Sequence, residues 1–160
     1  MATFKDAENY RWSRDFPALI EFPLERTSDD TRNYNCFAYA AGDEERPWDC
    51  LPILPRGVYW PPGVPRKEND VFSVMLGYET LGYALCDDGK LEDGVEKIAI
   101  YVDQNDVPTH AAIQRADGSW QSKLGAEIDV RHSLRSLEDY NGQPSLYGRA
   151  KYFMGRKKPT

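Results

Sequence analysis

Two side chains in this sequence have the chemistry of a nucleophile and its base. Cys36 lies in the stretch Asn33–Gly42, whose small and aromatic residues predict a short buried helix with the cysteine in its first turn. That position favours the thiolate, the reactive form of cysteine. His110 follows 74 positions later (110 − 36), beside the small residues Ala111 and Ala112. The two predict a Cys–His ion pair, with a buried structural thiol and a histidine at a strand end as the alternatives.

A Cys–His pair needs a third group that orients the imidazole. The dipeptide Asp117-Gly118 predicts a two-residue hairpin turn, which pairs residue 116 with residue 119 and brings Ser122 toward His110. Ser122 is therefore the first choice for the third catalytic residue. The alternatives are acidic residues just beyond the strand, Glu127 and Asp129.

The same chemistry needs donors for the oxyanion and a cleft for the substrate. The backbone N–H of Cys36 and a side-chain amide, from Asn35 or Asn33, are the predicted oxyanion donors. We expect substrate-cleft residues among bulky and charged side chains near the pair: Trp48, Tyr59, Trp60, Trp120 and Lys123. For the aromatic side chains the alternative is core packing, and Lys123 is predicted to be a charge on the surface or the cleft rim.

The elements that must position these residues can be predicted from their patterns. Residues 1–32 form an irregular lead-in with a short element at Pro17–Phe22, and residues 43–68 form a Pro-rich loop. A helix is predicted from residue 69 or 70 to 81, and another near 133–140 after a serine cap. Strands are predicted at 95–102, 109–116, 119–124 and 147–154. This order indicates an α+β fold with a mostly antiparallel sheet.

Composition limits the class of protein. The 160 residues suit one domain, residues 1–160, and the net charge of −6 with scattered basic residues argues against a nucleic-acid partner. No apolar run is long enough for a membrane span or a signal peptide, so a cytoplasmic protein is expected. Three cysteines and two histidines do not form a disulfide framework or a metal site, and no cofactor is predicted.

The order of a helix-borne cysteine, a strand and a histidine opening a hairpin resembles the papain-like superfamily, including its NlpC/P60-like and transglutaminase-like members. The segment from His110 to Trp120 is similar to the histidine segment of transglutaminase-like proteins, although Leu124 stands where those have an acid. Asn35-Cys36 is similar to the opening of some amidase-type members. From Asn33 to Arg156 the chain resembles an uncharacterised family of small bacterial and phage-related proteins, in the segments 35–43, 59–61, 96–101, 109–112, 120–125 and 147–148 and at His132.

The resemblance implies a papain-like core, in which a short Cys-bearing helix packs on the sheet. Two functions follow as hypotheses. The first is a cysteine hydrolase or acyltransferase that acts on an amide or isopeptide bond of a peptide or protein. The second is a catalytically inactive interaction module on the same scaffold, such as a phage-type inhibitor or an immunity-like binding protein. The sequence leaves the substrate and the oligomeric state open.

Overall fold

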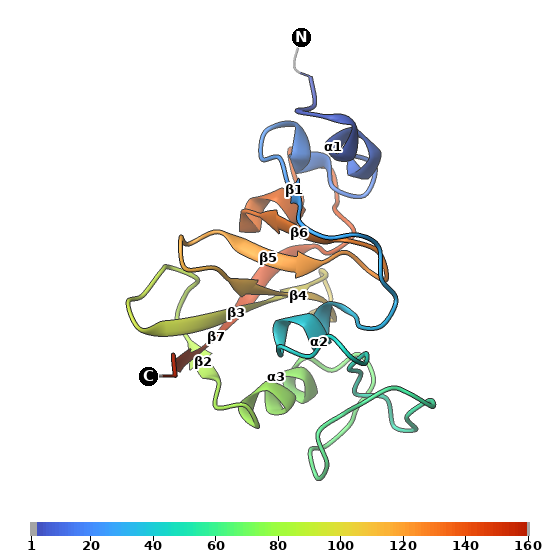
Figure 1. Ribbon diagram of the computed structural model, residues 1–160, viewed down its shortest axis with the longest axis vertical. Helices are drawn as coiled ribbons and strands as arrows, with labels where there is room; N and C mark the ends of the chain where they lie inside the picture. The colour runs from blue at the N-terminus through green and yellow to red at the C-terminus, as the bar shows by residue number, and fades with distance from the viewer. Residues whose placement is uncertain (1–2, 160) are drawn as a thin grey trace.

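A computed structural model describes residues 3–159 and contains a seven-stranded antiparallel sheet (Figure 1). The strands follow the order β1-β6-β5-β4-β3-β7-β2. Their bounds are β1 Glu25–Arg26, β2 Ala84–Cys86, β3 Val95–Val102, β4 Pro108–Gln114, β5 Trp120–Lys123, β6 Asp129–His132 and β7 Arg149–Lys157. The short helices are α1 Ala7–Trp12, α2 Cys36–Ala40 and α3 Val71–Glu79, with 3-10 helices η1 Pro17–Ile20 and η2 Leu134–Leu137. The fold is therefore a mixture of helix and antiparallel sheet, compatible with the predicted α+β class.

The sheet divides the hydrophobic core into two clusters, and strand β3 contributes to both. Its side chains alternate between the faces of the sheet, as in any pleated strand. Ile98 and Ile100 pack with α2, α3 and the Pro-rich loop on one face, whereas Ala99 and Tyr101 pack with the N-terminal segment on the other. We call these the α2 face and the N-terminal face.

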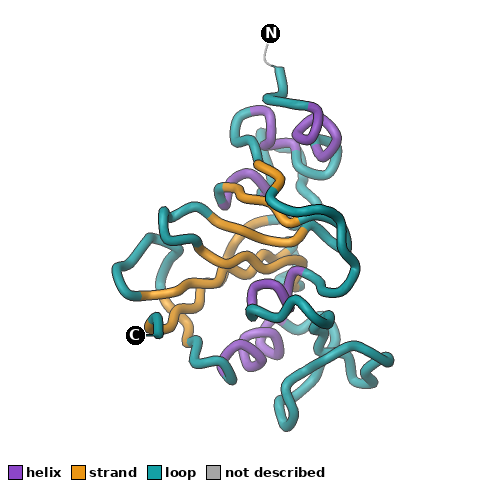
Figure 2. The backbone as a smooth tube through the Cα atoms, viewed as in Figure 1, coloured by secondary structure: helices purple, strands orange, loops and turns teal. Residues whose placement is uncertain are grey.

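The two helices on the α2 face begin at the residues that the sequence predicts. Asn35 caps α2 by accepting a hydrogen bond from the Ala38 backbone, and Asp70 caps α3 by accepting one from Ser73. The intervening residues 43–68 form a long loop, as predicted (Figure 2). An isolated bridge between Trp48 and Tyr59 closes this loop on itself.

The N-terminal segment is more regular than the irregular lead-in that we predicted. Asp6 caps α1, and the predicted element at Pro17–Phe22 is η1. Trp12, Phe16 and Leu19 are buried against the N-terminal face of the sheet. The prediction was wrong because the segment is only weakly apolar, and it gains its structure by covering the sheet.

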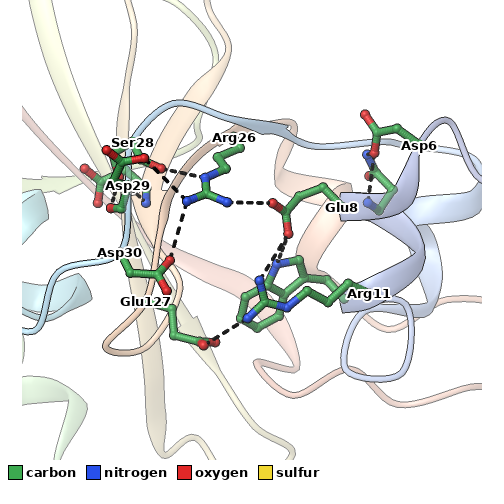
Figure 3. Close-up of polar contacts among 11 residues, drawn as sticks. Asp6, Glu8, Arg11, Arg26, Ser28, Asp29, Asp30 and Glu127 are labelled. Atoms are coloured by element: carbon green, nitrogen blue, oxygen red, sulfur yellow. Dashed lines mark hydrogen bonds and ion pairs between the residues drawn. The ribbon is translucent and has the colours of Figure 1, made fainter.

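Charged side chains fasten this segment to its neighbours (Figure 3). Arg11 of α1 pairs with Glu127 at 3.1 Å, and Arg26 of β1 pairs with Glu8 at 3.3 Å and with Asp30 at 3.6 Å. Because these groups are partly exposed, each pair stabilises the fold by only about 0–1 kcal/mol. Most of the stability of the segment therefore comes from its buried apolar side chains, and the ion pairs add little to it.

The β4–β5 hairpin differs from the prediction by one residue. Arg115 pairs with Ser119, so the loop contains three residues rather than two, and Gly118 adopts a φ of +89°. Gly118 is the residue that such a bulged loop requires in the left-handed region. The resulting register pairs Gln114 with Trp120 and Ile113 with Gln121, and the recorded pairing of β4 with β5 ends there.

Three strands, β1, β2 and β6, were absent from the prediction, and one predicted helix is shorter. β1 and β6 have polar sequences and β2 is only three residues long, and each is recruited by pairing with a neighbouring strand: β1 with β6, β6 with β5 and β2 with β7. The helix predicted near 133–140 is the single 3-10 turn η2, although Ser133 caps it as expected. The last strand, β7, begins and ends slightly later than predicted.

Candidate active site

Asn35 joins the start of α2 to the Pro-rich loop. Its side-chain oxygen accepts hydrogen bonds from the backbone N–H groups of Ala38 and Trp48, both at 3.0 Å. Its amide nitrogen donates to the Trp48 carbonyl at 2.8 Å. This amide therefore fixes the helix and the loop, a structural task different from the oxyanion role that we predicted for it.

The Cys36 thiol is buried next to the backbone of β4. Cys36 is only 7% exposed, and burial raises the pKa of its thiol to about 12. The backbone N–H groups of Ala111, Phe37 and Cys36 itself oppose this rise, because they favour the thiolate. In this conformation the thiol is neutral at physiological pH, and the N–H of Ala111 lies close to its sulfur.

His110 is fully buried in an aromatic setting. Its ring stacks on Tyr147 with the centroids 4.0 Å apart and the planes 7° from parallel, and it meets Tyr101 edge-on at 5.4 Å. Neither ring nitrogen has a hydrogen-bond partner within residues 3–159. Burial, and secondly the nearby His132, hold the pKa of His110 well below its usual range. The imidazole is therefore neutral.

Cys36 and His110 reach the same region from opposite faces of the sheet. His110 pairs with Tyr101 and shares its N-terminal face, whereas α2 lies on the other face. The recorded pairing of β4 with β5 ends at Ile113 and Gln121, and α2 contacts both strands. We call the boundary between β4 and β5 beyond these pairs the β4–β5 seam.

Shared neighbours place the thiol and the imidazole around this seam. The sulfur lies near the N–H of Ala111, the residue that follows His110. Burial raises the pKa of Tyr147, and a negative charge on the Cys36 sulfur would add to that rise, so the hydroxyl of the tyrosine that stacks on His110 is within electrostatic range of the sulfur. No hydrogen bond joins Cys36 to His110 in the described part of the chain.

Ser122 lies on the same face as His110 but bonds to a different histidine. Its hydroxyl is 2.7 Å from Nε2 of His132, whose Nδ1 is 2.8 Å from the Ser133 carbonyl. Because a carbonyl only accepts, Nδ1 carries the proton and Nε2 accepts from Ser122. The alternative third residues are also engaged: Glu127 pairs with Arg11, and Asp129 accepts from the Tyr34 hydroxyl at 2.8 Å.

Lys123 is not the surface or cleft-rim charge that we predicted. It is fully buried, donates to the Glu127 carbonyl at 2.5 Å and lies 4.5 Å from the centre of the Tyr34 ring. Burial lowers the pKa of its ammonium group. The prediction was wrong because Lys123, at the end of β5, faces α2. The aliphatic part of its side chain packs there, and its ammonium group contacts a carbonyl and an aromatic ring.

The predicted cleft aromatics divide into two groups. Trp48 packs against Tyr59 and Trp60, with ring centroids 5.1 and 6.2 Å apart, on the α2 face. Trp120 belongs to the N-terminal face, where it packs near Phe153. Trp120 therefore lies in a separate cluster from the other three.

Tyr147 belongs to the site, although it was not among the predicted site residues. Tyr147 lies before β7, far from both Cys36 and His110 along the chain, and it stacks on the imidazole. The dipeptide Tyr147-Gly148 is one of the segments in which the chain resembles the uncharacterised family, and this was the one signal in the sequence for a role of Tyr147. Gly148 has a φ of +76°, and a Cβ there would lie 2.1 Å from the Val102 carbonyl oxygen, so the tyrosine is followed by a residue that must be glycine.

Residues 25–155 match a family described as a domain of unknown function, DUF7689, and the chain belongs to that family. No curated protein matches the chain. No solved structure matches it either. Over residues 3–159, no helix is long and apolar enough to cross a membrane. Within that same range, no group of three or more His, Cys, Asp or Glu side chains is arranged to hold a metal ion.

Proposed function

We propose that this protein is a cysteine hydrolase or acyltransferase that acts on an amide or isopeptide bond, with Cys36 as nucleophile and His110 as its acid–base partner. The observation that carries the proposal is the buried imidazole of His110, whose two nitrogens have no hydrogen-bond partner within residues 3–159. The backbone N–H of the next residue, Ala111, lies close to the Cys36 sulfur. The proposal includes a papain-like arrangement of helix and sheet, a peptide or protein substrate and a cytoplasmic location.

A buried imidazole without hydrogen-bond partners destabilises the folded protein. Each buried polar group without a hydrogen bond costs about 1–3 kcal/mol, so proteins rarely retain one without a reason. A thiol that can exchange a proton with the ring supplies such a reason. Because the thiol and the ring are both neutral here, the reaction requires the β4–β5 seam to open, admit the substrate and bring sulfur and nitrogen to about 3–4 Å.

The proposed reaction balances through these two groups. The Cys36 sulfur attacks the carbonyl carbon while the thiol proton passes to His110. The oxyanion is held by the backbone N–H of Cys36. His110 then protonates the leaving amine as the C–N bond breaks, and water or a second amine releases the acyl group from the thioester. Asn35 has no part in this scheme because its amide binds Trp48.

Site-resolved alkylation tests the proposal. The intact protein is treated with iodoacetamide between pH 6 and 10, and the rate at each cysteine is read by peptide mass spectrometry. We expect Cys36 to react faster than Cys50 and Cys86 at pH 7, and at least 10-fold more slowly in His110→Ala. The proposal fails if Cys36 reacts only above about pH 9 and more slowly than the more exposed Cys86.

A second function, a catalytically inactive interaction module, is favoured by one observation. The thiol is 7% exposed with a pKa of about 12, which is typical of a cysteine that fills a core. In this case Cys36→Ala keeps the fold and any partner binding. The alkylation experiment separates the two functions, because a purely structural thiol reacts slowly at pH 7 and is insensitive to His110.

A further inference from the structure

Lys123 and Asp129 are two buried, oppositely charged residues that face each other across strands β5 and β6. They are paired residues of these two strands, which lie side by side (Figure 1). Lys123 is fully buried, and Asp129 is 5% exposed. Side chains of paired residues lie on the same face of a sheet, here the α2 face. A lysine and an aspartate therefore share one buried site that the proposed reaction does not use.

The pairing of these two residues is of the type that brings side chains closest. The backbone of Asp129 bonds to the segment that follows β1: its carbonyl accepts from the N–H of Thr27, and its N–H donates to the hydroxyl of Ser28. The backbone of Asp129 is thus turned away from β5. Lys123 and Asp129 form a non-hydrogen-bonded pair, whose Cα atoms are typically about 4.5 Å apart rather than about 5.5 Å.

Neither side chain has the partners that a buried charge needs. The Lys123 ammonium group donates to the Glu127 carbonyl at 2.5 Å and lies 4.5 Å from the centre of the Tyr34 ring, but it forms no ion pair within residues 3–159. Oδ2 of Asp129 accepts from the Tyr34 hydroxyl at 2.8 Å, whereas Oδ1 has no partner among the same residues. Because buried charges without partners are costly, a reaction that removes both charges stabilises this site.

The other carboxylates near Lys123 are engaged elsewhere. Burial lowers the pKa of Lys123, and the charges of Asp129, Asp30 and Glu127 oppose that effect, so all three lie within electrostatic range of the ammonium group. However, Glu127 pairs with Arg11 at 3.1 Å, and Asp30 pairs with Arg26 at 3.6 Å. Both of these carboxylates are also solvent-exposed in part. Asp129 is thus the buried carboxyl group that faces the lysine.

We propose that Lys123 and Asp129 join in an intramolecular isopeptide bond that links β5 to β6. The ammonium group first transfers a proton to the carboxylate, which gives a neutral amine and a carboxylic acid. The lone pair of Nζ then forms a bond to Cγ of Asp129, and the bond between Cγ and Oδ2 breaks. Oδ2 leaves as water with the carboxyl proton and one amine proton, so the reaction balances without an oxidant or a cofactor. Oδ1 becomes the carbonyl oxygen of the new amide.

Tyr34 assists this condensation. Its hydroxyl donates a hydrogen bond to Oδ2, which is the oxygen that leaves, and its ring lies against the amine. A donor held on the leaving oxygen stabilises the charge that develops there as the bond to carbon breaks. The tyrosine proton is not consumed.

Lys97 is the matched control within the same chain. It is 1% exposed, but its ammonium group pairs with Glu92 at 2.8 Å and with Asp88 at 3.4 Å. Burial lowers the pKa of Lys97, but hydrogen bonds to Glu92 and Asp88 outweigh that effect and raise its pKa above the usual value. An ammonium group that stays charged has no lone pair for attack, so Lys97 should remain unmodified.

Mass spectrometry of the full chain tests the bond. In denaturant, the intact protein should be lighter than its sequence by one water molecule. Trypsin cleaves an unmodified chain after Lys123 and yields the peptides 116–123 and 124–131, but it does not cleave after an acylated lysine. We therefore expect one peptide, 116–131, that lacks one water molecule. Its fragment spectrum should contain no ions from single breaks between residues 123 and 129, because that segment is a closed ring.

Four variants complete the experiment. Lys123→Arg and Asp129→Ala should restore the full mass, and Lys97→Arg should keep the loss of water. Tyr34→Phe should leave part of the chains at the full mass. These masses can be read whether or not a variant folds well, and the wild-type peptide map needs no variant.

The isopeptide bond is overturned if the wild-type protein has its full mass and yields the peptides 116–123 and 124–131. A loss of water that persists in Lys123→Arg also overturns it. Dehydration at Asp117-Gly118 would leave the cleavage after Lys123 intact, so the peptide map separates that event from the proposed bond. The test involves neither Cys36 nor His110, and its outcome is therefore independent of the proposed hydrolase function.

Discussion

At the scale of single residues, the two histidines give the molecule a specific pH dependence. Both are buried and neutral: burial holds the pKa of His110 well below its usual range and lowers that of His132 to about 4. The unfolded chain binds protons at a pKa near 6.5, so it takes up more protons than the folded chain below that pH. The contribution of each histidine to the free energy of unfolding is therefore fully present above about pH 6.5. It is lost as the pH falls toward the pKa of that histidine in the folded protein.

The lowered pKa values of the two histidines predict how much stability is lost at pH 5. Each histidine should contribute a fall of about 2 kcal/mol in the free energy of unfolding between pH 7 and pH 5. In His110→Phe, which keeps an aromatic ring against Tyr147, the fall should be smaller by about 2 kcal/mol. Urea unfolding of both proteins at the two pH values measures the difference. An identical pH dependence would mean that His110 is protonated, or accessible to water, in the folded protein.

Residue types and helix caps could be predicted from the sequence, whereas the burial of single side chains could not. Residue types single out Cys36 and His110 as reactive groups, and a cap of the Asn35 kind can be predicted from its position before a helix. Burial cannot be predicted in the same way. Lys123 occupies a strand position that alternation assigns to a polar surface, yet it is fully buried because α2 and Tyr34 cover that position.

At the scale of elements, α2 depends on one side chain. Helices of five residues are not stable by themselves, so α2 is held by its cap and its packing. Asn35 supplies the cap and two hydrogen bonds to Trp48. We expect Asn35→Ala to destabilise the protein by about 2–3 kcal/mol, because a cap is worth about 1 kcal/mol and the backbone of Trp48 also loses its partners.

Asn35→Asp is the matched control for this element. The aspartate keeps the acceptor for the Ala38 and Trp48 N–H groups, but it replaces the donor to the Trp48 carbonyl by a second acceptor oxygen. Its loss of stability, measured by urea unfolding, should be less than half that of Asn35→Ala. Equal losses would show that the donor to Trp48, rather than the helix cap, is the important contact.

Elements with strong local signals could be predicted, and those that depend on tertiary context could not. α3 follows an acidic cap, and β3 has an apolar β-branched run, so both were predicted within two residues of their bounds. The hairpin turn was found but its length was not, because Asp117-Gly118 suits a two-residue and a three-residue loop alike. β6 has a polar sequence, and its strand conformation comes from pairing with β5.

At the scale of the whole molecule, the N-terminal segment covers one of the two clusters of the hydrophobic core. The family match begins at residue 25, but Phe16 and Leu19, which precede it, are fully buried. Deletion of residues 1–22 would uncover Tyr101 and Ala112 on the N-terminal face. We expect this deletion to abolish cooperative thermal unfolding and to increase the binding of a hydrophobic dye.

Deletion of residues 1–5 is the control for this prediction, because it leaves α1 and η1 intact. That variant should unfold cooperatively within a few degrees of the full chain. A stable, dye-free protein lacking residues 1–22 would mean that the remaining chain closes the N-terminal face without the segment.

The limited pairing of β4 with β5 has a mechanical consequence. Strands β2, β7, β3 and β4 form one continuous block, and β5, β6 and β1 form another, yet the ladder between the blocks consists of two residue pairs beside the hairpin loop. Bending at that short ladder changes the angle between two intact blocks without breaking the hydrogen bonds inside either one. A change in that angle would alter the position of β4, which carries His110, relative to β5.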